Sequence, residues 1–138
     1  MLSIGALSKR TGVKVPTIRY YEQTGLLPPP ERTEGGQRRY GRDAEDRLAF
    51  IRHARALGFP VEAVAALIDL SSDPDRPCAE ASAIAAAQLE DVRARIARLQ
   101  RLETDLARIV DGCQGKGRAG DCYVLASLSD HGLCEREH

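Results

Sequence analysis

One stretch of the chain constrains the fold more than any other: from Cys78 to about Asp111, apolar residues recur at steps of three and four positions. They are Leu89, Val92, Ile96, Leu99, Leu106 and Val110, with Glu103 between Leu99 and Leu106. This spacing is the heptad pattern of a coiled coil, in which an apolar stripe on one helix packs against a second helix. The sequence therefore predicts one long helix that pairs with a partner helix.

The cysteines at the two ends of this helix limit how they can act together. Cys78 lies on the apolar stripe when the pattern is extended backwards, and Cys113 and Cys122 follow the helix. Cys78 and Cys113 are 113 − 78 = 35 residues apart, which is roughly 52 Å on a straight helix at about 1.5 Å per residue. These thiols of one chain therefore cannot share an ion or form one disulfide. In an antiparallel helix pair, Cys78 of one subunit meets Cys113 and Cys122 of the partner subunit.

Composition excludes several classes of protein. The 138 residues form one compact unit or two small ones, with 4% aromatic residues and no Trp, which favours a helical core of small aliphatic residues. No segment has the length of a membrane span and no signal peptide follows Met1, so we expect a cytoplasmic protein without a membrane partner. Four cysteines in a reducing compartment indicate metal or redox chemistry more than disulfides.

Charge is divided unevenly along the chain. Residues 1–60 carry 11 Lys and Arg against 6 Asp and Glu, a balance of +5, whereas residues 61–138 carry 9 against 14, a balance of −5. A basic front half points to a polyanion as its partner. Uneven surface charge without a function is the alternative explanation.

The front half has the helix start and stop signals of a helix-turn-helix. We expect a first helix over Leu2–Thr11 with Ser3 as its N-cap, and a second over about Pro16–Gln23. Gly12 and Gly25 end these two helices. Two helices joined by a short turn that contains glycine are typical of the unit whose second helix enters the major groove of DNA.

A small β-hairpin is expected after the second helix. The segment Glu31–Tyr40 has Gly35-Gly36 between short polar arms, which is typical of a hairpin tip. Arg38 and Arg39 on the second arm would place guanidinium groups against phosphate, and Tyr40 would anchor the arm to the core. The hairpin is therefore interpreted as the wing of a winged helix-turn-helix.

Two further helices complete the front half. One is expected from Asp43 to about Leu57, with apolar contacts from Leu48, Phe50 and Ile51, and another opens at Pro60. The outer face of the first carries several basic residues, namely Arg47, Arg52, His53 and Arg55. The run 71–77 is a turn-rich linker in which Ser72 or Asp73 caps local turns.

Residues on the second helix and the wing are the candidates for DNA contact. Arg19 is the strongest, for a base or a phosphate, and Thr17 and Tyr21 can bond phosphates. For Tyr20, a place in the protein core is favoured over DNA contact. A solvated basic face remains the alternative for the arginines.

Cys113 and Cys122 flank an eight-residue loop that can bring both sulfurs onto one ion. Thiolates suit soft ions, and three cysteines without a firm fourth ligand favour a large soft divalent ion over structural zinc. His131 and Cys134 are weaker candidates for a further ligand. The cysteine spacing does not fit an iron–sulfur cluster, and no histidine is placed as a base for a catalytic cysteine, so we do not expect an enzyme.

Several motifs carry a likeness to a known family. They are Ile4-Gly5-Ala6-Leu7-Ser8, Thr17-Ile18-Arg19-Tyr20-Tyr21-Glu22, Gly25-Leu26-Leu27, Arg38-Arg39-Tyr40 and Ala56-Leu57-Gly58-Phe59. Together, over about residues 1–128, they strongly resemble the MerR family of transcriptional regulators. The resemblance implies a mainly α fold with a winged helix-turn-helix, a long antiparallel coiled-coil helix and a C-terminal metal-binding loop. It implies a homodimer that distorts promoter DNA when its effector binds, so that RNA polymerase can use the promoter.

The resemblance and the patterns together divide the chain into five segments: a winged helix-turn-helix DNA-binding domain (1–71), a linker (72–77), a dimerisation helix (78–111), a metal-binding loop with a short helix (112–128) and a tail (129–138). The expected DNA-contacting residues are Lys14, Thr17, Arg19, Tyr20, Tyr21, Arg38, Arg39 and Arg55.

Within the family, the rear half is similar to the metal-sensing branch and above all to its mercury-responsive members. The similar motifs are Cys78-Ala79-Glu80-Ala81-Ser82, Asp91-Val92-Arg93, the Cys113 and Cys122 pair, and Ala126-Ser127-Leu128. This likeness implies Hg(II) bound by Cys113, Cys122 and Cys78 of the partner subunit. Cysteine at position 78 argues against Cu(I), and the residues at 114, 118 and 119 disfavour Zn(II). Pb(II), Cd(II) and Zn(II) remain alternatives, and Cys134 departs from the mercury-responsive pattern.

Two other hypotheses stay open. One is a regulator of the same fold whose cysteines are oxidised instead of binding metal. The other is a helical scaffold or thiol-dependent metal carrier that does not regulate DNA. Binding of the protein to its own upstream DNA separates the second hypothesis from a regulator.

Overall fold

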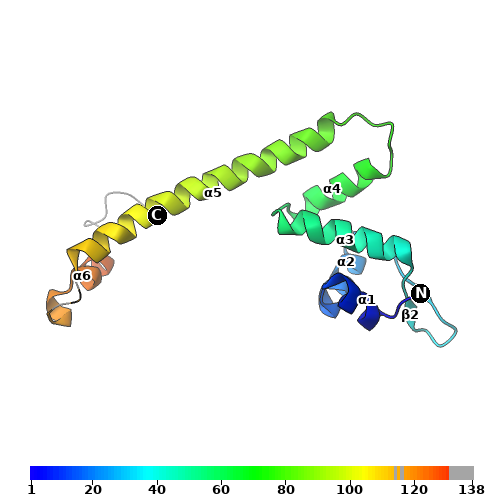
Figure 1. Cartoon of the computed structure of the whole chain (residues 1–138), viewed down its shortest axis with the longest axis horizontal. Coiled ribbons are helices and arrows are strands. Elements are labelled where there is room, and N and C mark those ends of the chain that lie inside the picture. The colour runs from blue at the N-terminus through cyan, green and yellow to red at the C-terminus, as the bar shows by residue number, and fades with distance from the viewer. Residues whose placement is uncertain (114, 116, 131–138) are drawn as a thin grey trace. The chain divides into compact units, whose positions relative to one another are not determined.

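The computed structural model is mainly helical, and it describes residues 1–113, 115 and 117–130 (Figure 1). The elements are α1 (Ile4–Thr11), α2 (Val15–Gln23), β1 (Glu31–Arg32), β2 (Arg38–Arg39), α3 (Arg42–Ala56), α4 (Val61–Ser71), α5 (Ala79–Gly112), a 3-10 turn η1 (Ala119–Asp121) and α6 (Tyr123–Ser129). The chain forms two compact units, Met1–Gln88 and a second that begins at Leu89. Among the described residues, none of the helices combines the length and the apolar character that a membrane crossing requires.

The first two helices begin and end where the sequence indicates. The Ser3 hydroxyl accepts a hydrogen bond from the Ala6 N–H, and Gly12 closes α1 in the left-handed conformation with φ 76°. Proline occupies the first turn of α2, which tolerates a residue without an N–H. The helix-turn-helix prediction is confirmed. One detail was wrong: Leu2 lies outside α1, because its backbone pairs with that of Tyr40.

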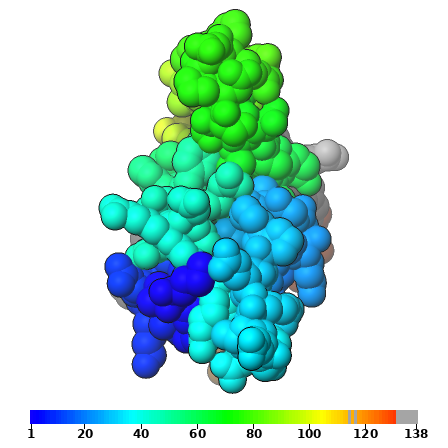
Figure 2. Space-filling model, turned by 90° about the vertical axis from the view of Figure 1, so that its right-hand side faces the viewer, coloured from blue at the N-terminus to red at the C-terminus, as the bar shows by residue number. Residues whose placement is uncertain are grey.

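The predicted wing is confirmed as a two-stranded antiparallel hairpin. Glu31 pairs with Arg39 and Arg32 with Arg38. The backbone N–H groups of Leu2 and Tyr40 each donate to the other residue's carbonyl over 2.8 Å, which ties the end of the hairpin to the N-terminus. Figure 2 shows the consequence on one face, where the dark blue N-terminal residues lie against the cyan hairpin.

The core of the first unit draws on α1, α2, α3, α4 and the connectors. Its buried apolar residues are Leu7, Val13, Ile18, Tyr21, Leu26, Leu27, Tyr40, Leu48, Ile51, Ala54 and Val64. Two expectations about this core were wrong. Tyr20 is 49% exposed, because Ile18 and Tyr21, three residues apart, form the inner face of α2. Phe50 is 40% exposed, so it adds little to the buried contacts that α3 makes.

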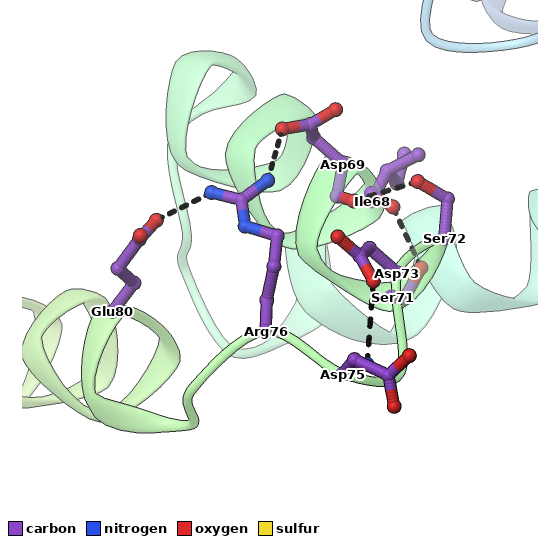
Figure 3. A network of polar contacts seen from close by, with 8 residues as sticks. All are labelled: Ile68, Asp69, Ser71, Ser72, Asp73, Asp75, Arg76 and Glu80. Atoms are coloured by element: carbon purple, nitrogen blue, oxygen red, sulfur yellow. Dashed lines mark hydrogen bonds and ion pairs between the residues drawn. The ribbon is translucent and has the colours of Figure 1, made fainter.

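Arg76 bridges the turn between α4 and α5 (Figure 3). Its guanidinium group donates to the Asp69 carboxylate at the end of α4 and to the Glu80 carboxylate in the first turn of α5, each over 2.7 Å. The hydrogen bond to Asp69 is the main reason that the pKa of Arg76 is raised. Within the turn, the Asp75 N–H donates to the Asp73 carboxylate, a local cap of the predicted kind.

Candidate nucleic-acid interface and candidate metal centre

The recognition helix α2 presents a partly basic surface. Lys14 precedes the helix in an extended conformation, and both Lys14 and Arg19 are exposed to solvent. Thr17 is half-buried, and Tyr20 is exposed with its ring centroid 5.9 Å from that of Tyr21. Tyr21 belongs to the core at 7% exposure, which leaves little of its side chain accessible to DNA.

Glu22 joins the recognition helix to the wing. Its carboxylate accepts a hydrogen bond from the Tyr40 hydroxyl and lies 3.4 Å from Nε of Arg38. Burial, the bond to Glu22 and the charge of Glu22 together raise the pKa of Tyr40 far above its usual range. An acidic residue of α2 is thus turned inward, where it holds the base of the wing against this helix.

The second wing arginine is held by its own strand. Arg39 donates to the Arg38 carbonyl over 3.2 Å and to the Gln37 side-chain oxygen over 3.3 Å. Both wing arginines are half-buried. Their guanidinium groups are therefore partly oriented by the protein before any nucleic acid arrives.

Three arginines expected on or near the outer face of α3 donate to backbone carbonyls, which no local sequence signal indicates. Arg47 donates to Leu26, Arg52 to Thr11 and Arg55 to Phe59, over 3.3, 2.6 and 2.8 Å respectively. The carbonyl of Thr11 lies at the C-terminus of α1, where the helix dipole favours a cation. Arg55, an expected DNA contact, remains exposed while it makes this bond.

The thiols of Cys113 and Cys122 lie together. Cys113 directly follows α5, Cys122 directly precedes α6, and their sulfurs are 3.4 Å apart. A disulfide requires about 2.05 Å, so both are free thiols. Hydrogen bonds lower the pKa of Cys113, first from the Gly115 N–H, then from the Cys122 thiol, then from the N–H groups of Val124 and Tyr123.

This pair of donors fits a soft metal ion. Two thiolates on a tetrahedral ion with metal–sulfur bonds of about 2.3 Å lie about 3.8 Å apart, so a separation of 3.4 Å needs only a small opening. Hydrogen bonds that lower a thiol pKa also favour the deprotonated form that a metal requires. Among the described residues, no group of three or more His, Cys, Asp or Glu side chains is arranged to hold a metal ion.

The remaining candidate ligands are Cys78, Cys134 and His131. Cys78 is exposed and directly precedes α5, whose 34 residues confirm the long helix that the heptad pattern predicts. Cys134 and His131 lie outside the described residues.

The apolar stripe of α5 is exposed. Its six large residues, Leu89, Val92, Ile96, Leu99, Leu106 and Val110, are between 37% and 64% exposed. A contiguous apolar stripe of this length on an exposed helix face is typical of an interaction surface.

Comparison with known families and proteins identifies the chain. Residues 2–70 match the model of the MerR HTH family regulatory protein, and residues 45–109 match the model "MerR, DNA binding". The two matches overlap and together run from the first helix through most of α5.

Individual relatives are similar over nearly the whole chain. The mercuric resistance operon regulatory protein of Serratia marcescens is 40% identical over 127 residues, 92% of this chain and 87% of the relative. The transcriptional regulator ZntR of Escherichia coli K12 is 41% identical over 130 residues, 93% of this chain and 92% of the relative. The crystal structure of the regulator PbrR691 from Ralstonia metallidurans CH34 in complex with lead(II) superposes with a TM-score of 0.80 at 35% identity, covering 93% of this chain and 99% of that one. The chain therefore belongs to the metal-sensing branch of the MerR family of DNA-binding transcriptional regulators, which are not enzymes.

Proposed function

We propose that the protein is a homodimeric, cytoplasmic regulator of a heavy-metal resistance promoter, which activates transcription by distorting DNA when a thiophilic divalent ion binds. The observation that carries this proposal is the pair of free thiols 3.4 Å apart at the end of α5. A soft ion suits two thiolates, and a helix with an exposed apolar stripe suits a partner helix. RNA polymerase at the same promoter is the proposed functional partner.

The proposed metal ligands are Cys113, Cys122 and Cys78 of the partner subunit. A continuous helix of 34 residues separates the first cysteine of the chain from the other two, roughly 51 Å at about 1.5 Å per residue. An antiparallel partner would therefore be needed to bring Cys78 to the pair. Hg(II) is the proposed effector, supported by the mercuric resistance relative, and the lead(II) complex keeps Pb(II) as an alternative beside Cd(II) and Zn(II).

The proposed DNA contacts come from α2 and the wing. Arg19 and Lys14 supply exposed cations, Thr17 a hydroxyl, and Arg38 and Arg39 guanidinium groups directed by neighbouring side chains. Tyr20, Tyr21 and Arg55 complete the set, with Tyr20 favoured over Tyr21 because its ring is exposed. Residues 1–71 would act as the DNA-binding domain, 72–77 as linker, 78–111 as dimerisation helix and 112–128 as metal-binding segment.

Coupling from metal to DNA would run through the start of α5 and α4. Cys78 stands two residues after Arg76, whose side chain holds the end of α4 and the first turn of α5 together. Fixing the thiol of Cys78 on an ion held by the partner subunit would therefore restrain the α4–α5 turn. The bound ion supplies only the crosslink, and each thiol that binds it loses a proton.

A promoter-reporter assay across Hg(II), Pb(II), Cd(II) and Zn(II) tests the proposal. We expect Cys78→Ser to abolish induction by every one of these ions, whereas a gel shift with the promoter stays as in the native protein. Unchanged induction by Hg(II), Pb(II) and Cd(II) in this variant would show that the site is not shared between subunits. Absence of sequence-specific DNA binding at moderate salt would refute the regulator itself.

A thiol-redox regulator is the second candidate, and the same thiol pair favours it. Sulfurs at 3.4 Å need only a modest approach to form a disulfide, and the lowered pKa of Cys113 favours the reactive thiolate. Titration with metal under strict reduction separates the two. Stoichiometric binding that survives excess small thiol supports metal sensing, whereas induction by oxidant without metal supports redox sensing.

A further inference from the structure

Gly112, the last residue of α5, lies directly beneath the ring of Tyr123, the first residue of α6. A Cβ atom placed on Gly112 would lie 2.3 Å from Cδ1, 2.6 Å from Cε1 and 2.8 Å from Cγ of that ring. Real Cβ atoms essentially never approach other heavy atoms below 3.0 Å. The contact includes Cγ, where the ring joins its side chain, so rotating the ring alone cannot make room for a methyl group.

This contact is next to both thiols in the covalent chain. Cys113 follows Gly112 and Cys122 precedes Tyr123, so the glycine and the ring meet at the neck of the loop that carries the sulfurs. Backbone bonds hold each side, from Cys113 N–H to the Val110 carbonyl over 3.1 Å and from Cys122 N–H to the Ala119 carbonyl over 3.2 Å. Each of these bonds is local to its own side of the neck. The Gly112–Tyr123 contact spans the neck, beside the hydrogen bonds that the Val124 and Tyr123 N–H groups make to the Cys113 thiol.

We propose that Gly112 and Tyr123 form a clasp that positions the Cys113 and Cys122 thiols as a dithiol. The two residues can approach this closely only because glycine has no side chain. Both are positioning residues, since neither supplies a ligand atom. As a role in metal sensing, the inference rests on the proposed function; as a statement about thiol geometry, it stands without it.

A trivalent arsenical tests the clasp without any metal. Phenylarsine oxide condenses with two thiols: two As–S bonds form, and the arsenical oxygen leaves with both thiol protons as one water. It therefore reports whether two sulfurs of one chain can reach one arsenic atom. The protein would be the full-length, reduced and metal-free chain carrying Cys78→Ser and Cys134→Ser, so that only the loop thiols react.

A double-mutant cycle separates the clasp from general damage to the fold. We expect Gly112→Ala to weaken arsenical binding at least tenfold while the ring is present. In a Tyr123→Ala background, where the three nearest opposing atoms are removed, the same substitution should change binding less than twofold. Tyr123→Phe keeps the ring and should bind the arsenical like the parent protein with Cys78→Ser and Cys134→Ser.

Alanine is the better helix former, so a loss in Gly112→Ala cannot come from a weakened α5. Promoter binding should be the same in all variants, because residues 1–88, which carry the proposed DNA contacts, form a compact unit that does not include the loop. Circular dichroism checks that the helical content of the variants is unchanged. Arsenical binding unaffected by Gly112→Ala, or weakened equally with and without the ring, would overturn the clasp. A clasp that passes this test in a protein that binds no metal would refute the proposed function alone.

Discussion

The wing and the thiol loop solve the same problem, that of fixing a short irregular segment, in opposite ways. The wing is held from inside: Tyr40 is 1% exposed, and the half-buried carboxylate of Glu22 accepts a hydrogen bond from the Tyr40 hydroxyl and pairs with Arg38. The thiol loop is held at its neck by an aromatic ring on a glycine and by hydrogen bonds to the Cys113 thiol, and both cysteines are half-buried. The wing is held by contacts within one chain, whereas the cysteines of the loop are half-buried and the apolar stripe of α5 is exposed. A surface that reads a fixed structure gains from rigidity, and one that captures an ion needs free ligands.

The largest expected effect comes from the exposed stripe. Leu99→Lys places a charge at the centre of the proposed helix pair, and burying it should weaken dimerisation by on the order of a hundredfold or more. Analytical ultracentrifugation measures the dissociation constant. Gln100→Lys is the matched control, because Gln100 is also exposed but lies off the stripe, and it should leave the dimer intact. A dimer unaffected by Leu99→Lys would mean that the stripe has another occupant.

The anchor of the wing should give an intermediate effect. Tyr40→Phe removes the hydroxyl that Glu22 accepts and should lower the free energy of unfolding by about 1–2 kcal/mol, with little change in thiol reactivity. Urea unfolding at neutral pH measures this loss.

The same variant carries a pH signature. Because the pKa of Tyr40 is raised in the folded chain, the native protein should lose stability as pH rises above the ordinary tyrosine value of about 10, where the unfolded chain ionises first. Below that value the contribution of Tyr40 is complete. Tyr40→Phe should show a shallower alkaline loss, and an equally steep loss in both proteins would contradict the assigned cause.

The smallest effect concerns the thiol loop. The Gly115 N–H is the main cause that lowers the pKa of Cys113, so alkylation of Cys113 should reach half its maximal rate at a lower pH in the folded protein than in urea. Peptide mapping after iodoacetamide pulses follows this residue alone. Cys122→Ser should move the folded profile only partway towards the unfolded one, because the backbone donors remain. Identical dependence of the alkylation rate on pH in folded and unfolded protein would contradict a lowered pKa of Cys113 in the folded loop.

Local signals account for most of what the sequence could predict. Gly12, Gly25 and the prolines stop or start helices through their own backbone constraints, so the bounds of α1, α2 and α5 were predicted within about two residues. The stripe of α5 was visible because periodicity over 34 residues averages out exceptions.

The features that the sequence did not predict depend on contacts between distant segments. Neither the bond from Arg52 to Thr11 nor the contact of Gly112 with Tyr123 has a local signature. For Tyr20 and Tyr21, a nine-residue helix offers too few turns to show which neighbour faces inward. Sequence patterns thus locate the candidate site, whereas its geometry comes from tertiary packing.

The bridge made by Arg76 bears on the mechanics of the chain. A turn of several residues between two helices ordinarily lets one helix rotate without moving the other. Arg76 shortens the free length of that turn by fastening Asp69 to Glu80 across it. Under the proposed function, this bridge would let the end of α4 follow a movement of the first turn of α5.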